Sequence, residues 1–204
     1  MARGECEAAV GTAAREDGIE LSKMPAVSWL RSRGHLHLPA RAQAALPIMQ
    51  RAFELLGGDV EAMRGKRLSN LPNDLLHSGS RTMVEVDESQ HFISMRGVTL
   101  DLLEPESAGF DLREYRGLVA ALHPRSDRYF AAKVTFGIPG PRSRGRGRAY
   151  FDLLRDVVAP LMGYRVVRVA AVEAASSDGA KGAAAYCKAR ERLLAATGSS
   201  ALTA

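Results

Sequence analysis

The sequence predicts an α/β fold in which a mixed β-sheet is flanked by helices. Three observations predict it: amphipathic helical periodicity on both sides of the middle of the chain, a β-hairpin pattern over residues 74–87, and a separate apolar strand over residues 164–172. With 204 residues, 46% hydrophobic and 25% charged, the chain is long enough for one ordinary domain with a core. Its sequence has no apolar run long enough to cross a bilayer.

The first clear element is a helix over residues 40–56. Its apolar positions recur at intervals of three and four, and Gly57 and Gly58 stand where a helix should stop. Pro47 lies either near the true start of this helix or at a kink within it. Residues 1–38, which precede it, show only weak periodicity, so we interpret them as a poorly determined N-terminal arm.

A predicted hairpin of two short strands, 74–77 and 82–87, comes next. Gly79 occupies the first central position of the turn, which favours a type II′ turn. With that two-residue loop, Leu75 lies opposite Val84 and each strand continues outward in register. We therefore expect an antiparallel pair with one face in the core.

The other face of the hairpin gathers three acids, because opposed residues share a face and alternate residues point the same way. They are Asp74, Glu85 and Asp87. Carboxylates this close repel one another unless a cation neutralises them, and Mg²⁺ binds oxygen ligands without needing Cys or His. The alternative is a strand end that carries ordinary surface acids. His91, four residues beyond Asp87, is either a general acid/base or a packed histidine without function.

Helices dominate the second half of the predicted fold. Asp111 is a plausible N-cap for a helix over 111–122, with Glu114 at the third helical position. The Gly- and Pro-rich segment 137–148 is expected to be an irregular loop, and a helix over 147–162 follows it. The strand over 164–172 and one further helix complete the chain.

Positive charge is concentrated in this half of the chain. Residues 123–168 contain ten Arg or Lys against three Asp, within a chain of net charge +5. Four arginines at alternating positions suit bidentate contact with phosphates, and would bind nucleic acid without reading its sequence: Arg142, Arg144, Arg146 and Arg148. The alternative is a solvated basic loop.

The cysteines and the N-terminus limit the remaining possibilities. Cys6 and Cys187 are far apart and have no further Cys or His at ligand spacing, so neither a disulfide framework nor a zinc knuckle is expected. The N-terminus lacks the basic start and apolar stretch of a signal peptide, and we expect a cytoplasmic protein.

The acids also carry a resemblance to a known family. Asp74, followed after an interval by Glu85-Val86-Asp87 and then by Gln90-His91, resembles the PD-(D/E)XK nuclease superfamily, and within it small proteins similar to very-short-patch-repair endonucleases. The stretch "EVDESQH" stands where that branch carries an E-x-D-G-x-x-H-like strand. The resemblance covers residues 40–170 approximately.

The resemblance implies a restriction-endonuclease-like fold and metal-dependent hydrolysis of DNA. In this chain it implies that Asp74, Glu85 and the carbonyl of Val86 hold Mg²⁺ or Mn²⁺, with Glu54 reaching in from the first helix. Metal-activated water would then attack the phosphodiester. The catalytic set that follows is Asp74, Glu85, Asp87, His91 and Lys133.

Two departures from the family pattern leave alternatives open. Asp87 stands where the superfamily has a lysine, so Lys133 or an arginine would have to supply the positive charge, and Glu88 replaces the expected glycine and adds a further negative charge. We expect a nuclease domain over 39–175 and a C-terminal helix with a flexible tail over 176–204. The alternatives are a nuclease fold that only binds nucleic acid, and a partner-binding protein.

Overall fold

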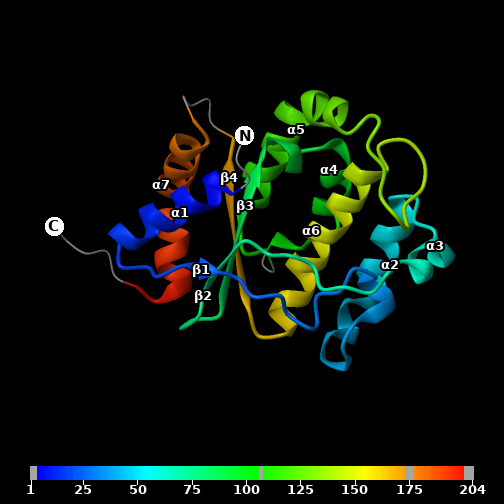
Figure 1. Cartoon of the computed structure of the whole chain (residues 1–204), viewed down its shortest axis with the longest axis horizontal. Helices are drawn as coiled ribbons and strands as arrows, with labels where there is room; N and C mark the ends of the chain where they lie inside the picture. The colour runs from blue at the N-terminus through cyan, green and yellow to red at the C-terminus, as the bar shows by residue number, and fades with distance from the viewer. Residues whose placement is uncertain (1–3, 106–107, 173–176, 200–204) are drawn as a thin grey trace. The chain divides into compact units, whose positions relative to one another are not determined.

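The computed structural model describes residues 4–105, 108–172 and 177–199. It is a mixed α/β structure with one four-stranded mixed sheet flanked by helices (Figure 1), so the predicted fold class is confirmed at this level. The chain forms two compact units that alternate along the sequence. Unit 1 comprises Met1–Pro25, Pro72–Ser89 and Gly163–Ala204, and unit 2 comprises Ala26–Leu71 and Gln90–Met162.

Unit 1 contains the whole sheet, in the order β1-β2-β3-β4. The β1–β2 and β2–β3 pairs are antiparallel, whereas β4 runs parallel to β3. The strands are β1 (Ser22–Lys23), β2 (Leu75–His77), β3 (Thr82–Glu88) and β4 (Arg165–Ala171).

The predicted hairpin register is confirmed, but the predicted turn is wrong. Leu75 pairs with Val84, as the sequence indicates. Gly79 does not take the positive φ that a type II′ turn requires, and Arg81 takes it instead, at 54°. The loop is longer than two residues because its own side chains hold it: the Ser80 hydroxyl bonds to the His77 ring, and the Arg81 guanidinium lies over the Tyr164 ring.

The core of unit 1 lies between one face of the sheet and two helices, α1 (Glu5–Glu16) and α7 (Asp178–Thr197), which pack side by side (Figure 1). Val10 of α1 and Leu193 of α7 are fully buried there. The described part of the predicted N-terminal arm, residues 4–38, is divided between the two units: α1 supplies core side chains and β1 extends the sheet in unit 1, and residues 26–38 belong to unit 2. The predicted C-terminal helix belongs to the same unit, and the tail over 200–204 lies outside the described residues.

Unit 2 is built from helices. Pro47 lies in the first turn of α2, the first α-helix of this unit, so the predicted helix begins there and is preceded by 3₁₀ turns. Asp111 caps α5 by accepting hydrogen bonds from the backbone amides of Arg113 and Glu114, as predicted. The α-helices of unit 2 are α2 (Leu46–Leu55), α3 (Val60–Gly65), α4 (Ser94–Leu100), α5 (Leu112–Tyr129) and α6 (Ser143–Leu161).

Two further expectations concern the thiols and the membrane. Cys6 and Cys187 are both free, the first buried and the second exposed. Within the described ranges, no helix combines the length and the apolar character needed to cross a membrane.

Side-chain hydrogen bonds between the end of α1 and α7, which we call the clamp, predict that stability depends on pH. Asp17, at the end of α1, accepts hydrogen bonds from Arg190 and from the Tyr186 hydroxyl on α7. The Arg190 hydrogen bonds, and then that of Tyr186, lower the pKa of Asp17 from 3.8 to about 2. Because the carboxylate is the favoured form in the folded state, its contribution to stability is present above pH 3.8 and is lost as the pH falls through about 2.

We expect Asp17→Asn to lower the melting temperature at pH 6 and to flatten its decline between pH 4 and pH 2, as measured by circular dichroism. Arg15→Gln, which removes an exposed ion pair at the end of the same helix, is the matched control and should leave the profile unchanged. Identical profiles for Asp17→Asn and the unmutated chain would contradict this role of the clamp.

Candidate functional site

Two of the three predicted acids, Glu85 and Asp87, alternate along β3 and lie on one face of the unit 1 sheet. Asp74 directly precedes β2 and its carboxylate bonds to the amide of Val86, between these two acids. We call this place, with Asp74, Glu85 and Asp87, the acid face. Asp74 is half-buried, whereas Glu85 and Asp87 are 4% and 1% exposed. These carboxylates are therefore held in a largely desolvated place, unlike a solvated strand end.

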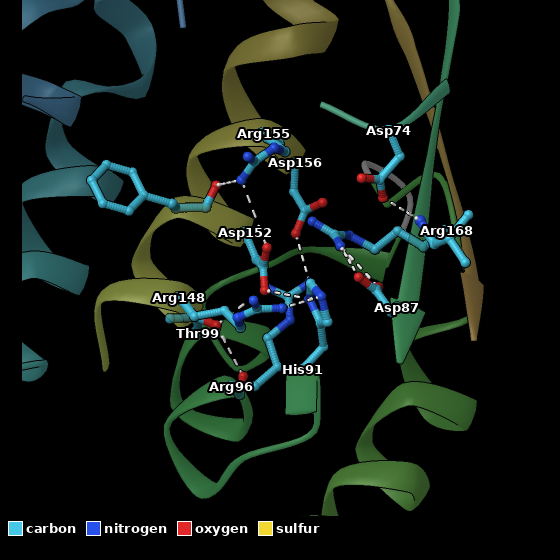
Figure 2. A network of polar contacts seen from close by, with 12 residues as sticks. Asp74, Asp87, His91, Arg96, Thr99, Arg148, Asp152, Arg155, Asp156 and Arg168 are labelled. Carbon is cyan, nitrogen blue, oxygen red and sulfur yellow. Dashed lines mark hydrogen bonds and ion pairs between the residues drawn. The ribbon is translucent and has the colours of Figure 1, made fainter. Parts of the chain in front are cut away.

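Asp74 completes the sheet where β2 begins. Its Oδ2 accepts a hydrogen bond of 2.8 Å from the backbone amide of Val86 (Figure 2), so a side chain takes the position of a ladder partner. In a strand, the amide and carbonyl of one residue point to the same side. The Val86 carbonyl thus points to the same side of β3 as its amide, which is the side where Asp74 lies.

Asp87 is neutralised by an arginine that the sequence did not single out. Nη1 of Arg168 lies 2.9 Å from both carboxylate oxygens of Asp87 (Figure 2). Arg168 is on β4, pairs in register with Glu85 and is fully buried. The alternating pattern of the last strand contained the signal, because Arg168 interrupts an otherwise apolar run in its middle.

Glu88 does not add its charge to the acid face. It alternates with Val84 and Val86, and its carboxylate lies against the Cys6 thiol on the opposite side. Burial, together with the Glu88 carboxylate, raises the pKa of that thiol from 9.0 to about 12. Cys6 is therefore protonated at neutral pH and is no nucleophile.

The donors on the acid face are few. Among the residues that the structure describes, no three His, Cys, Asp or Glu side chains form a group that could hold a metal ion. Two carboxylates and one carbonyl remain, from Asp74, Glu85 and Val86, and this is an oxygen set of the size that Mg²⁺ accepts when water and substrate phosphate complete its shell.

His91 forms a network of its own within unit 2 (Figure 2). Its Nδ1 lies 3.1 Å from Oδ2 of Asp152, and Arg148 donates a hydrogen bond to its Nε2. A guanidinium can only donate, so Arg148 engages Nε2, while Asp152 lies at the Nδ1 side of the ring. In this arrangement His91 is a fixed element of the network, and its predicted role as an acid/base stays a prediction.

Sequence reasoning also missed a second buried ion pair, which lies in unit 2. Nη2 of Arg96, on α4, donates a hydrogen bond of 2.8 Å to Asp156 on α6. Both side chains are almost fully buried. The sequence gives no signal for this pair beyond the charges themselves, because sixty residues separate the partners.

The prediction of an irregular loop over 137–148 is wrong from Ser143 onward, where α6 begins. The glycines allow close packing: a Cβ at Gly145 would lie 3.2 Å from Ile93, and one at Gly147 would lie 2.8 Å from Thr135. Packing in the folded chain thus outweighs the low helix propensity of glycine.

The helix separates the four arginines that were predicted to act together. Residues two apart on a helix point in nearly opposite directions. Arg142 and Arg144 are exposed. Arg146 is held by the backbone carbonyls of Leu56 and Pro139, and Arg148 is held by His91.

Lys133 and Glu54, two further predicted residues, lie in unit 2. The Lys133 ammonium lies 3.0 Å from the centroid of the Tyr129 ring. Glu54 is on α2, where it faces Arg51 and lines a cavity of about 390 Å³ together with Arg142 and Phe130. The positive charge beside the acids within unit 1 comes from Arg168.

The buried pair on the acid face yields a stability prediction. Arg168→Met leaves Asp87 buried without its arginine, so we expect a loss of about 3–5 kcal/mol in the free energy of unfolding, measured by urea denaturation. Arg165→Met, on the same strand but exposed, removes one hydrogen bond to a backbone carbonyl and should cost about 1 kcal/mol.

The double variant Asp87→Leu/Arg168→Met removes both charges and should recover most of the stability. If the double variant were no more stable than Arg168→Met, the loss would come from packing of the arginine and not from the charge of Asp87.

No protein-family model, no curated protein and no solved structure matches this chain.

Proposed function

We propose that the chain is a metal-dependent endonuclease of restriction-endonuclease-like fold, which hydrolyses DNA phosphodiester bonds at the acid face. The observation that carries the proposal is the placement of Glu85 and Asp87 on one face of β3, with the Asp74 carboxylate bonded to the amide of Val86 between them and Arg168 paired to Asp87. The mixed sheet with its flanking helices is of the kind that the sequence resemblance implies.

The acids on the acid face favour a divalent cation. Arg168 is paired with Asp87, and Glu85 and Asp74 lie beside this pair. Carboxylates held close together where Glu85 is buried supply the oxygen ligands that Mg²⁺ and Mn²⁺ take.

The ligand set that we propose for Mg²⁺ or Mn²⁺ consists of Asp74, Glu85 and the carbonyl of Val86. The hydrogen bond from the Val86 amide orients the Asp74 carboxylate and holds it beside β3. When bound, the metal supplies an activated water and stabilises charge on the phosphate. Arg168 engages both carboxylate oxygens of Asp87, and Asp74 is the most exposed of the three acids.

A second candidate is a nuclease fold that binds nucleic acid without cleaving it. The pair of Asp87 and Arg168 favours this alternative, because the position that the family fills with lysine is here an acid engaged by a buried arginine. The two candidates share the DNA partner and differ in the chemistry at Glu85.

Cleavage of supercoiled plasmid distinguishes them. We expect nicking with Mg²⁺ or Mn²⁺ that is abolished by EDTA, and a loss of at least about 100-fold in the nicking rate for Asp74→Asn and for Glu85→Gln, since a direct ligand contributes more than an outer one. Glu88→Gln removes a carboxylate from the same strand but the opposite face, and is the matched control with an unchanged rate.

Nicking that survives in both Asp74→Asn and Glu85→Gln would refute the ligand assignment. Absence of cleavage with intact, salt-sensitive DNA binding would instead select the binding module. Titration of Mn²⁺ followed by electron paramagnetic resonance gives a readout that does not depend on turnover: the unmutated chain should bind the ion and Glu85→Gln should bind it more weakly.

A further inference from the structure

One surface segment of unit 2 combines exposed rings with cations. It consists of residues 128–136, at the end of α5 and after it, together with Arg142 and Arg144 at the start of α6. Of the five large hydrophobic side chains exposed among the described residues, three lie in this segment: Tyr129 at 56%, Val134 at 77% and Phe136 at 54%. This concentration sets the segment apart from the rest of the described surface.

The segment is held in a defined shape by bonds to α6. The hydroxyl of Ser143 accepts a hydrogen bond of 2.7 Å from the backbone amide of Thr135, and the amide of Arg144 donates to the carbonyl of Lys133 at 3.1 Å. The Gly137 carbonyl accepts from the amide of Asp59. The exposed rings are thus presented by a fixed backbone, which lowers the entropy cost of binding.

One cation lies against the ring of Tyr129, and two others act on its hydroxyl through their charge. The Lys133 ammonium lies over one face of the ring. A hydrogen bond to Lys133, and then the charges of Lys133, Arg144 and Arg148, lower the pKa of the Tyr129 hydroxyl. Between Arg125 and Arg144 the sequence has five Arg or Lys against one Asp, so the segment favours an anionic partner.

We propose that this segment is a docking surface for single-stranded DNA, on which Lys133 and Arg144 contact phosphates and Tyr129 stacks against a base. The inference rests on the proposed function for its choice of DNA. A duplex keeps its base faces stacked and offers an exposed ring little beyond phosphates, whereas a single strand offers both phosphates and open base faces. The exposure of Tyr129 and Phe136 therefore favours the single strand.

Binding is measured in EDTA by fluorescence anisotropy, with a fluorescein-labelled 15-nucleotide oligo(dT) and with a 15-base-pair duplex, so that no cleavage occurs. We expect Tyr129→Ala to weaken binding of the single strand by roughly 5- to 150-fold and to change duplex binding less than about twofold. Tyr129→Phe keeps the ring and should bind as tightly as the unmutated chain.

The contribution of the cations to binding is tested with a separate variant and control. Lys133→Gln/Arg144→Gln should weaken binding of both probes and reduce the slope of log K against log salt for the single strand by about 1.4, since each phosphate contact contributes about 0.7. Arg41→Gln removes one exposed arginine of the same unit and should change neither value. Circular dichroism verifies that each variant is folded.

Equal affinity of the unmutated chain for both probes, or an unchanged affinity of Tyr129→Ala for the single strand, would overturn this proposal. These outcomes are separate from failure of the nuclease. If the unmutated chain nicks plasmid with metal but does not bind oligo(dT), the result counts against the docking surface only. If it binds oligo(dT) but does not nick plasmid, the result supports the docking surface and counts against the nuclease.

Discussion

The ion pair between Asp87 and Arg168 is the constraint on which the acid face depends. Strand β3 is buried along six consecutive residues, two of which are acids. An ionised carboxylate without a partner costs several kcal/mol in such a place. Arg168 removes this cost for Asp87 and is itself buried, so neither charge is tolerable without the other.

The same pair fixes the alignment of β4 on β3. A slip of one residue would move Arg168 to the opposite face of the sheet, among Val84, Val86 and the side chains of α1 and α7. The parallel register that places Arg168 beside Glu85 is therefore specified by charge as well as by the apolar pattern. The ion pair between Asp87 and Arg168 forms in this register of β3 and β4 and would be lost in a one-residue slip.

The hairpin shows which part of the fold the sequence could predict. Its register followed from alternation and from the positions of its apolar residues, and both are local properties of the chain. The turn was predicted incorrectly because Gly79 carries a strong local signal that the loop does not use. Contacts of Ser80 and Arg81 with other residues decide its shape, and a turn rule based on residue type does not include them.

Helix α6 shows the opposite limit. Three arginines and two glycines in its first turns resemble a flexible loop when each residue is considered by its own propensity. Close packing of Gly145 and Gly147 against Ile93 and Thr135 makes glycine the suitable residue in a helix at these positions. Only the tertiary neighbours carry that information, and the same holds for Arg96 with Asp156 and for Arg168 with Asp87.

The structure shows that many cations in the basic segment 123–168 are not available to a partner. Several of its cations are engaged internally: Arg168 by Asp87, Arg155 by Asp152, Arg146 by backbone carbonyls and Arg148 by His91. A count of charges along the sequence thus overstates what a partner meets. The cations that remain at the surface near Tyr129 are few but lie beside exposed rings, and this pairing, more than net charge, gives the surface its chemical preference.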